Sequence, residues 1–490
     1  MISEVRTRFA PSPTGYMHIG NLRTALYSYL FARSRNGKFI LRIEDTDSER
    51  YIEDSMSMIF NTLKETKLFY DEGPDIGGKF GPYIQSQRKE IYFSHAKKLV
   101  NQGDAYYCFC DKERLRRVHD EQKKIKVPPK YDGYCRNISN EEIQRKLELG
   151  ISYVIRQKIP KFGFTSFEDE VFGNISVENF SLDDGVLIKS DGLPTYNFAN
   201  VIDDHLMKIS HVIRGNEYLS STPKYVLLYK SFDWKIPYYV HVPPIIKENG
   251  KKLSKRDGDA TFEDLIKLGF LEEAIINFIA LLGWSSKTER EIFSLSELEE
   301  MFDITGLGKS PAVFDVKKLL WLNGEYIKKM TFDEFHKNAL VYYSKVIKNS
   351  MLDLEKVSEL LHTRCEKFSD IVSQVDFFEE LKDYEVSLFI HKKMKTDFEN
   401  SLSSLIKILQ IVEELPKWNE EILKDKLVDL AVKLNVKNGV ILWPLRVAVT
   451  GKAFTPGGGV EISIILGKEE TIKRIKIGIE KLKNLNHFLI

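Results

Sequence analysis

The first 44 residues constrain the fold more than any other part of the chain. Residues 5–9 alternate between arginines and other side chains, a period of two that predicts a strand. Two prolines and two glycines keep the next segment, 10–20, non-helical. Apolar residues at helical spacing follow over 22–30, Gly37 ends that helix, and 39–44 reads as a second strand. This strand–helix–strand order predicts a parallel sheet with a right-handed crossover.

Two loops of this unit are expected where a ligand would bind, because parallel sheets bind ligands beyond the carboxyl ends of their strands. They are the 10–20 loop and the acidic turn 44–47. His18 precedes the predicted helix, whose first N–H groups and dipole favour an anion such as phosphate. A histidine there can also donate to a phosphate that gains charge in a transition state. Gly20 leaves room for a nucleobase or ribose. The alternative for His18 is an ordinary loop histidine.

Composition is that of a globular protein of about three domains. The chain has 490 residues, of which 43% are apolar and 29% charged, so a disordered tail, a collagen and a coiled-coil rod are excluded. The net charge of +1 excludes a histone-like polycation but not a local basic patch. The amino terminus has no apolar signal core, and the longest charge-free apolar stretch, 274–286, is too short to span a bilayer. We therefore expect a cytoplasmic protein that does not bind membranes.

The α/β pattern is interrupted and later replaced. Residues 105–190 hold three cysteines, a basic stretch at 111–130 and short mixed strands, which predicts an inserted domain. The α/β pattern returns at 186–246, and apolar spacing predicts one helical run over 262–284. From about residue 330 the chain reads as helix after helix, with strand-like alternation only in the last 50 residues.

Three of the four cysteines lie close in sequence and indicate a metal site. Cys108, Cys110 and Cys135 supply three thiolates, one fewer than the four nitrogen or sulfur ligands that structural zinc takes. The alternative is three reduced, buried cysteines. Cys365 is isolated and is expected to be a core thiol.

A second phosphate-binding element is the basic run KKLSKRDG at 251–258. Small residues and glycine around several cations suit a mobile loop that clamps a triphosphate. The alternative is a solvated surface loop, the usual state of a charged run.

The loop RFAPSPTGYMHIG together with KLSKR resembles the paired signature of class I aminoacyl-tRNA synthetases. Further motifs resemble the bacterial glutamyl-tRNA synthetases specifically, and the resemblance covers essentially the whole chain. Asn21 stands where many class I members have a second histidine, which puts more weight on His18. KLSKR replaces KMSKS and keeps both lysines. The matching segments are RFAPSPTG (8–15), LRIEDTD (41–47), YDEGPDIGG (70–78), GPYIQSQR (81–88), SDGLPTYNFANVIDDHLMKISHVIRG (190–215), PAVFDVKKLLWLNGEYI (311–327) and LRVAVTGKAFTPGG (445–458).

The resemblance implies an α/β fold: a Rossmann-type parallel-sheet catalytic domain with an inserted α+β domain, followed by an all-α carboxy-terminal region that binds the anticodon. The inserted domain would meet the acceptor end of tRNA, with lysines on phosphates. The expected domains are 1–104 with 186–246 for catalysis, 105–185 for the insertion with its zinc knuckle, 247–328 for a stem-contact region that carries KLSKR, and 329–490 for the helical region, in two subdomains.

The resemblance also implies the reaction. L-Glutamate would be activated by ATP with Mg²⁺ to glutamyl-adenylate and then transferred to the 3′ end of tRNA-Glu, with the tRNA assisting the activation step. The residues implied for phosphate stabilisation are His18, Lys252 and Lys255, and those for adenosine are Gly20, Asn21 and Glu217.

A glutamate pocket needs two cationic or strong donor groups and one acidic group, because glutamate carries two carboxylates and one ammonium. An arginine fork suits a planar carboxylate and offers no acceptor to an amide, so glutamine is disfavoured. The residues implied are Arg8 with Tyr196 for the side-chain carboxylate, Arg214 with Asn200 for the α-carboxylate, and Glu44 with Ser12 and the Ala10 backbone for the ammonium.

Two further roles follow from the resemblance. Structural Zn²⁺ would take Tyr131, as phenolate, for its fourth ligand, with His119 as the alternative. Arg364 falls where the family places a residue that faces the third anticodon base, and there it would favour the C of tRNA-Glu over the G of tRNA-Gln. The alternative for Arg364 is a contact with a phosphate or with Glu366.

Other functions remain open from the sequence. The enzyme could also charge tRNA-Gln, which the residues do not decide. Rival functions are a small-molecule nucleotidyltransferase, a truncated paralogue that glutamylates a tRNA base, and an RNA-binding protein on an inactive core. The first two need no helical tail of about 160 residues, and the retained charged residues speak against the third. A monomer is expected.

Overall fold

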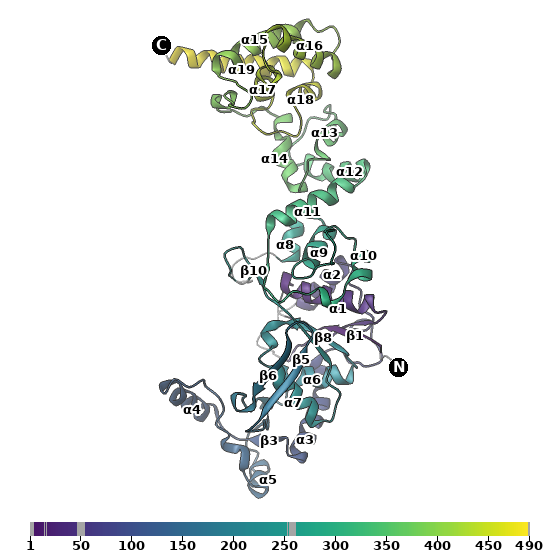
Figure 1. Cartoon of the computed structure of the whole chain (residues 1–490), viewed down its shortest axis with the longest axis vertical. Coiled ribbons are helices and arrows are strands. Elements are labelled where there is room, and N and C mark those ends of the chain that lie inside the picture. The colour runs from purple at the N-terminus through teal and green to yellow at the C-terminus, as the bar shows by residue number, and fades with distance from the viewer. Residues whose placement is uncertain are drawn as a thin grey trace. The chain divides into compact units, whose positions relative to one another are not determined.

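The computed structural model describes residues 4–13, 15, 17–46, 54–251, 253 and 261–488. The chain divides into two compact units, Met1–Lys267 with Glu272–Val316, and Leu268–Leu271 with Lys317–Ile490. In the described residues the first unit is α/β and the second is helical, which confirms the predicted fold class (Figure 1). Among the described helices, none is both long and apolar enough to cross a membrane.

The predicted strand–helix–strand unit forms at the amino terminus. Strand β1 (Arg6–Phe9) pairs in parallel with β2 (Lys38–Leu41), and helix α1 (Ile19–Ser34) connects them. All four residues of β1 are buried, the two arginines included. The alternation therefore does not separate a buried face from a solvated one. Arg6 is paired with Glu72 and Arg8 with Asp204 on one face, and Thr7 and Phe9 are buried on the other, so both faces of the strand lie inside the protein.

A four-stranded sheet extends this unit. Strands β8 (His211–Gly215) and β9 (Tyr238–Val242) run in parallel, and β9 also pairs in parallel with β5 (Phe164–Asp169). An antiparallel hairpin joins β5 to β6 (Gly173–Glu178). Hydrogen bonds between Arg6 and Ser210 connect β1 to the start of β8. The result is a mixed, mostly parallel sheet system.

The expected insertion, 105–185, contributes strands to two sheets. Strands β3 (Ala105–Cys108), β4 (Val154–Gln157) and β7 (Val186–Ile188) form an antiparallel sheet of their own. The β5–β6 hairpin instead joins β9. A hairpin pattern in sequence is the same whichever sheet the hairpin enters, so this long-range pairing could not be predicted.

The predicted helical run over 262–284 is wrong as a single helix. The structure has α8 (Phe262–Lys267) and α9 (Glu272–Ala280), with a break at Gly269. Gly269 has φ +88°, the left-handed region that favours glycine. A Cβ at this position would lie 2.8 Å from the Ser369 backbone nitrogen. Both helices bury their apolar residues, so the hydrophobic spacing continues across the break.

The other elements of the first unit surround these sheets. The remaining helices and short strands are α2 (Ser55–Glu65), α3 (Lys89–Gln102), α4 (Lys112–Lys124), α5 (Asn140–Glu148), α6 (Tyr196–Leu206), α7 (Thr222–Ser231), α10 (Leu295–Met301), β10 (Ile245–Ile246) and β11 (Ala312–Val313).

The second unit is built from helices around its own hydrophobic core, which includes Cys365, fully buried as predicted. The strand-like alternation near the carboxyl end belongs to helix α17 (Asn438–Thr450). Nine of its thirteen residues are buried, and a helix buried on most sides loses the 3.6-residue pattern. Its other helices are α11 (Val316–Lys329), α12 (Phe332–Tyr343), α13 (Leu354–Leu361), α14 (Ile371–Val375), α15 (Phe398–Glu414), α16 (Glu420–Lys433), α18 (Gly459–Leu466) and α19 (Lys468–Phe488).

Candidate active site

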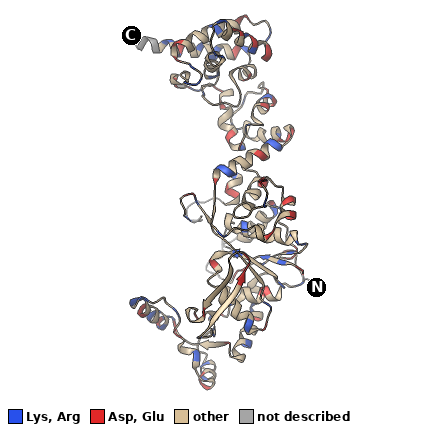
Figure 2. Ribbon diagram, in the orientation of Figure 1, with Lys and Arg blue, Asp and Glu red and all other residues tan. Residues whose placement is uncertain are grey.

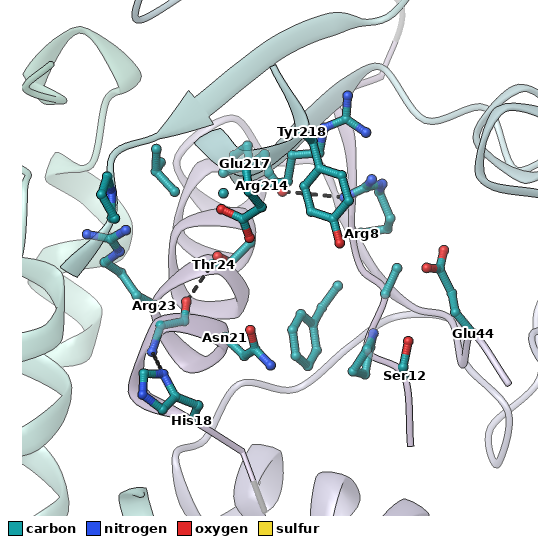
Figure 3. Close-up of a pocket in the computed structure, with 18 of the residues that line it drawn as sticks. Arg8, Ser12, His18, Asn21, Arg23, Thr24, Glu44, Arg214, Glu217 and Tyr218 are labelled. Atoms are coloured by element: carbon teal, nitrogen blue, oxygen red, sulfur yellow. Dashed lines mark hydrogen bonds between the residues drawn. The ribbon is translucent and has the colours of Figure 1, made fainter. Parts of the chain in front are cut away.

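A pocket of about 510 Å³ lies where the sheet rule predicts it. Its walls come from the segments that follow the carboxyl ends of β1, β2, β8 and β9, together with the start of α1. Figure 3 shows His18 on the α1 side, Glu44 and Ser12 at the other end, and Arg8, Arg214 and Tyr218 between them. The predicted residues that line it are Arg8, Ala10, Ser12, His18, Gly20, Asn21, Glu44, Tyr196, Arg214 and Glu217.

His18 caps the amino end of α1. Its backbone is extended, and its Nδ1 accepts a hydrogen bond of 3.0 Å from the N–H of Gly20. The neutral imidazole must therefore carry its proton on Nε2, which makes Nε2 a donor. A Cβ on residue 20 would lie only 3.3 Å from Nδ1, so glycine suits the close approach. A donor at a helix amino end is the arrangement expected for a phosphate site.

Arg8 is held by an internal carboxylate. Its Nε lies 3.1 Å from Asp204 Oδ1, and both side chains are almost fully buried. Tyr196, its predicted partner on the substrate, also lines the pocket and packs its ring against Tyr218. Burial opposes ionisation of Asp204, but Arg8 and Arg42 outweigh it and lower the pKa of that carboxyl. Arg8 therefore has a counter-ion before any substrate binds.

Arg214 differs from Arg8 in this respect. The described residues contain no carboxylate within ion-pair distance of its guanidinium, although the side chain is buried. Its Nε donates to His241 Nε2 at 3.1 Å and its Nη2 to Thr222 Oγ1 at 2.8 Å. Nη1 is buried without a hydrogen-bond partner. An unpartnered cationic donor in a pocket wall fits an anionic substrate group.

Asn200 does not line the pocket. It is buried on α6, one turn after Tyr196, and its Nδ2 donates to the Tyr196 carbonyl at 2.7 Å. The predicted pairing of Asn200 with Arg214 on the α-carboxylate therefore has no direct geometric support. Its contact instead braces the helical turn that carries Tyr196.

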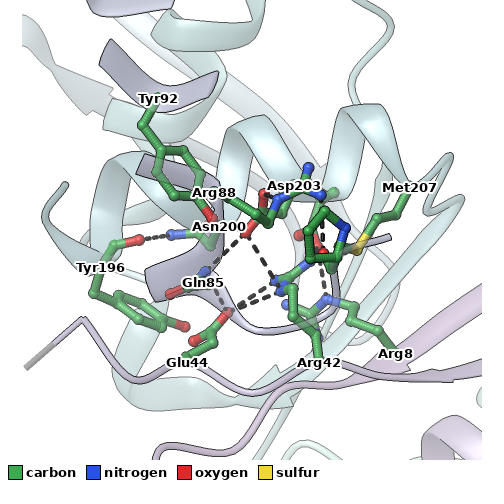
Figure 4. A network of polar contacts seen from close by, with 12 residues as sticks. Arg8, Arg42, Glu44, Gln85, Arg88, Tyr92, Tyr196, Asn200, Asp203 and Met207 are labelled. Carbon is green, nitrogen blue, oxygen red and sulfur yellow. Dashed lines mark hydrogen bonds and ion pairs between the residues drawn. The ribbon is translucent and has the colours of Figure 1, made fainter. Parts of the chain in front are cut away.

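Glu44 is positioned by a fully buried arginine, as Figure 4 shows. Arg42 Nη2 lies 2.9 Å from Glu44 Oε1, and Arg42 Nη1 lies 2.7 Å from Asp204 Oδ1. Glu44 Oε2 is buried and has no hydrogen-bond partner. Burial raises the pKa of Glu44 to about 7, with Arg42 and Arg8 acting against that shift. An ammonium group that reached Oε2 would stabilise the ionised form.

A third carboxylate, that of Asp203, completes this network from the other side. Asp203 accepts from Arg88 Nε at 2.7 Å, Tyr92 at 2.8 Å and Gln85 at 2.9 Å, and Arg42 Nε lies 3.8 Å away. Gln85 also lies 3.4 Å from Glu44 Oε1. The sequence predicted no roles for Arg42, Asp203 or Asp204. Their only sequence signal is that charged residues stand inside otherwise apolar segments.

The two lysines predicted to bind phosphates, Lys252 and Lys255, lie outside the described residues. Leu253, from the same KLSKR motif, is described, is buried, and lines the pocket. Arg23 of α1 ties the pocket floor together, because its Nη1 donates to the Leu282 carbonyl at 2.9 Å and its Nη2 contacts the Pro243 carbonyl.

The three predicted cysteines form one cluster with a tyrosine. Their Sγ atoms all lie within 4.8 Å of one another. The Tyr131 hydroxyl lies 3.4 Å from Cys108 Sγ and 3.5 Å from Cys110 Sγ, and it accepts from the Cys135 N–H at 2.9 Å. Burial raises the pKa of the Tyr131 phenol. His119, on the exposed helix α4, is not among the residues of the described chain whose ligand atoms form this cluster.

Helix α4 carries the basic stretch and has no buried residue. Both signs of charge mark it in Figure 2. Its amino end is fixed by Asp111, whose side chain accepts from the Arg114 N–H. Arg114 in turn pairs with Asp132 and lies 3.5 Å from Cys110 Sγ. The cysteine cluster thus anchors a solvent-exposed, mixed-charge helix.

Arg364 lies at the surface of the second unit. Its Nη1 donates to the Leu360 carbonyl at 3.0 Å and to the Pro456 carbonyl. No ion pair with Glu366 is present among the described contacts. The side chain is therefore held by backbone oxygens while its charge is not neutralised by that neighbour.

The chain is similar to known proteins over nearly its whole length. The family model described as the catalytic domain of class I tRNA synthetases (E and Q) matches residues 4–321, and a model of an anticodon-binding domain matches 334–479. A curated glutamate–tRNA ligase of Clostridium tetani is 59% identical over 482 residues, covering 98% of this chain and 99% of that protein. One of Clostridium acetobutylicum is 59% identical over 481 residues, with the same coverage.

The structure is also similar to solved structures over nearly its whole length. The crystal structure of a glutamate tRNA ligase from Elizabethkingia meningosepticum in complex with its amino acid superposes with a TM-score of 0.86 at 35% identity. That of the glutamate-tRNA synthetase from Elizabethkingia anophelis superposes with a TM-score of 0.87 at 34% identity. Each match covers 98% of this chain and 100% of the solved chain.

Proposed function

This chain belongs to the class I tRNA synthetases for glutamate and glutamine, and from that premise we propose that it is a glutamate–tRNA ligase with its chemistry in the pocket described above. One observation carries the proposal. The pocket wall holds a buried guanidinium with an unpartnered Nη1, on Arg214, and a buried carboxylate with an unpartnered Oε2, on Glu44. The carboxylate and the ammonium of an amino acid supply these two partners, and Arg8 in the same pocket wall is the cation for an acidic side chain.

The first step activates glutamate. An oxygen of its α-carboxylate attacks the α-phosphorus of ATP, the bond from that phosphorus to the bridging oxygen breaks, and pyrophosphate leaves. ATP enters as its Mg²⁺ complex. His18, a donor at the start of α1, stabilises the negative charge that develops on the phosphates. Lys255 and Lys252 serve the same purpose from KLSKR, whose Leu253 reaches the pocket.

Glutamate is selected by charge. Glu44 and the Ser12 side take the ammonium, and Arg8 and Arg214 take the carboxylates. A guanidinium has only donors, so an amide NH₂ placed against it would leave two donors facing each other. Glutamine is thereby disfavoured, as a site that hydrogen-bonds one group rejects the analogue that lacks it.

The second step transfers the glutamyl group. The 2′-hydroxyl of the terminal tRNA ribose attacks the activated carbonyl, and AMP leaves. The protein contributes orientation and charge stabilisation, with no covalent intermediate on its own side chains. Glu217, Asn21 and Gly20 hold the adenosine side of the pocket.

The cysteine cluster fits a structural zinc ion. Tetrahedral zinc with Zn–S bonds of about 2.3 Å places sulfurs about 3.8 Å apart, and Cys110 Sγ and Cys135 Sγ lie 3.5 Å apart. Tyr131 would supply the fourth ligand, because its hydroxyl already lies beside Cys108 and Cys110. When bound, zinc would cross-link β3 to the loop before α5 and would take no part in the reaction.

The choice of tRNA is the finer part of the proposal. Arg364 would face the third anticodon base and favour tRNA-Glu over tRNA-Gln. Charging requires tRNA and ATP together, so we place the enzyme in the cytoplasm. A monomer stays our expectation from the sequence.

Aminoacylation of purified tRNA tests the function. The full-length protein is incubated with ATP, Mg²⁺, labelled glutamate and either tRNA-Glu or tRNA-Gln, with labelled glutamine as the control amino acid. We expect glutamyl-tRNA-Glu, little glutamyl-tRNA-Gln and no glutaminyl product. A protein that forms no glutamyl-tRNA and shows no ATP–pyrophosphate exchange with glutamate and tRNA would not have this function.

A further inference from the structure

Arg214 is oriented by two residues that do not line the pocket. Its Nε donates to Nε2 of His241, at 3.1 Å, and Nδ1 of His241 lies 2.6 Å from Asp169 Oδ2. All three side chains are buried. They come from three neighbouring strands: Asp169 ends β5, His241 lies in β9, and Arg214 lies in β8.

The hydrogen-bond pattern fixes the tautomer of His241. A guanidinium N–H can only donate, so Nε2 must be an acceptor, and the proton of the imidazole must be on Nδ1. Asp169 accepts that proton's hydrogen bond. A ring whose Nε2 accepts a hydrogen bond is neutral. Burial lowers the pKa of His241 in keeping with this; the hydrogen bond to Asp169 acts against that shift and the nearby Arg214 charge acts with it. The ring thus presents a lone pair to Arg214 only as long as Asp169 holds the proton on the opposite side.

Asp169 is itself held firmly. Its Oδ1 accepts from the N–H groups of Val171, at 3.0 Å, and Phe172, at 2.8 Å, in the turn between β5 and β6. Its Oδ2 also accepts from the backbone N–H of His241 at 3.2 Å. The carboxylate is therefore an acceptor in every contact and has a fixed orientation.

Thr222 fixes a second nitrogen of Arg214, Nη2, by accepting a hydrogen bond from it. Its hydroxyl donates to the Tyr218 carbonyl at 2.8 Å, which leaves a lone pair for Arg214 Nη2. With Nε and Nη2 each fixed on an acceptor, the plane of the guanidinium is set. The remaining nitrogen, Nη1, is the one without a partner.

We propose that Asp169 and His241 are positioning residues that set the guanidinium plane of Arg214 so that Nη1 meets a carboxylate of the amino-acid substrate. The inference rests on the proposed function, because the substrate is the counter-ion that Arg214 lacks. Neither residue touches the substrate. Their effect should therefore fall on glutamate binding and not on ATP, whose predicted contacts lie at the start of α1, on KLSKR and at Glu217, none of them hydrogen-bonded to Asp169 or His241 in the described structure.

The sharpest variant is Asp169→Asn. The amide oxygen can keep the two bonds from Val171 and Phe172, but its NH₂ then faces His241 Nδ1. The ring must move its proton to Nε2, which turns a donor toward the donor Nε of Arg214. We expect the KM for glutamate to rise about tenfold or more, the loss of a hydrogen bond to a charged group. The KM for ATP should stay within about twofold.

Two substitutions at His241 separate positioning from packing. His241→Gln keeps an acceptor oxygen near the place of Nε2 and should hold the glutamate KM within about threefold. His241→Leu keeps the volume but removes the acceptor and should match or exceed Asp169→Asn. The matched control is His211→Gln, on the neighbouring strand β8, whose Nδ1 contacts Ser210 Oγ and which does not line the pocket. It should leave the glutamate KM unchanged.

Nitrogen-15 NMR of histidine-labelled protein supplies a readout independent of activity. The wild type should show a neutral, Nδ1-protonated ring for His241, and Asp169→Asn should show Nε2 protonation. The inference is overturned if the tautomer does not change, if the glutamate KM stays near the wild-type value, or if glutamate and ATP KM values rise together with a lower melting temperature. Inactive wild-type protein would instead refute the proposed function.

Discussion

At the residue scale, the pocket is a set of charges arranged before the substrate arrives. Three arginines, Arg8, Arg42 and Arg88, are matched by three carboxylates, Glu44, Asp203 and Asp204, all nearly fully buried. Such a network costs desolvation but holds each group in one orientation. Arg214 stands outside this balance, so the empty pocket has a local excess of positive charge that a dicarboxylic amino acid removes.

Glutamate use should depend on the ionisation of Glu44. Its pKa is raised to about 7 by burial, so the carboxylate is protonated below that pH and cannot accept the substrate ammonium. We expect kcat/KM for glutamate to rise with pH through about 7, and Glu44→Gln to abolish both the rise and most of the activity. The contribution of Glu44 to stability has the opposite sign. The folded state binds one more proton than the unfolded state between the ordinary pKa and about 7, so stability falls as pH rises through that window.

The measurement is a pH profile of kcat/KM for glutamate at saturating ATP and tRNA, with a parallel profile for ATP as the control. A flat glutamate profile between pH 6 and 8, or an identical rise for ATP, would assign the ammonium to another group.

Removing one carboxylate of the buried network should be costly. Asp204→Asn leaves Arg8 and Arg42 without a counter-ion that lies 3.1 Å and 2.7 Å away. We expect the unfolding free energy to fall by about 3–5 kcal/mol, the usual effect of breaking a buried ion pair. The comparison variant is Glu273→Gln, which breaks the exposed pair with Lys67 and should cost less than about 1 kcal/mol. The free energy of unfolding is measured by calorimetry. Equal losses of it in the two variants would contradict the charge balance of the buried network.

The sequence predicted which residues line the pocket better than it predicted what holds them. Arg8, Glu44 and Arg214 could be identified because they lie within or just after strands and stand in recognisable motifs. Their supports could not be, since Asp204 lies 196 residues from Arg8 and Asp169 lies 72 residues from His241. Hydrogen-bond partners at such separations depend on how strands pair, and sequence periodicity carries no information on that.

At the element scale, the cysteine cluster links β3, the loop at 131–135 and helix α4. Three thiols and a phenol in one small volume are a poor apolar core but a suitable ligand set. Helix α4 has no fully buried residue, and its Leu115 packs half-buried against this cluster, so the placement of the helix relies on the cluster and on its polar contacts.

Tyr131→Phe should therefore weaken zinc binding without removing the thiols. We expect about one zinc per chain by elemental analysis, and a lower zinc affinity in the variant by competition with a chelator. A tenfold to hundredfold loss is the order expected when part of a metal's support is removed. His119→Ala should retain full affinity. Protein purified without chelators that holds no zinc would leave three reduced cysteines as the correct interpretation.

Arg364 is the prediction for the helical unit. Two backbone carbonyls hold its Nη1, so the remaining N–H groups project from a fixed arm. Arg364→Ala should lower the ratio of kcat/KM for tRNA-Glu to that for tRNA-Gln. The expected factor corresponds to about 1–3 kcal/mol, the size of one direct base contact. Lys433→Ala, the loss of an exposed cation on α16, should leave the ratio unchanged. If Arg364→Ala slows both tRNAs equally, the side chain contacts the backbone of the tRNA.

The single predicted helix over 262–284 shows where element-scale reasoning fails. Periodicity reports which residues are buried, and burial continues through the break. The break depends on one left-handed glycine, Gly269, packed against Ser369 from a distant part of the chain.

At the scale of the whole molecule, two units with separate hydrophobic cores should not unfold as one. We expect two transitions in differential scanning calorimetry of the full chain. ATP with glutamate should raise the first unit's transition only, because the pocket lies within that unit. The Asp204→Asn variant identifies that transition by lowering it. One cooperative transition that ligands shift as a whole would mean that the units are thermodynamically coupled.

Strand β1 is synthesised long before β8, the strand beside which it lies in the folded protein. Its neighbour β8 lies about two hundred residues later, since Arg6 bonds to Ser210 across 204 positions. On a ribosome that adds about 5–20 residues per second, β1 leaves the tunnel roughly 10–40 s before that neighbour exists. In this interval β2 is the strand partner of β1, and the edge that will face β8 is free. A free strand edge is prone to aggregate, and charged side chains on the strand oppose this. We expect Arg6 and Arg8 to serve this purpose until Glu72 and Asp204, their ion-pair partners, have been made.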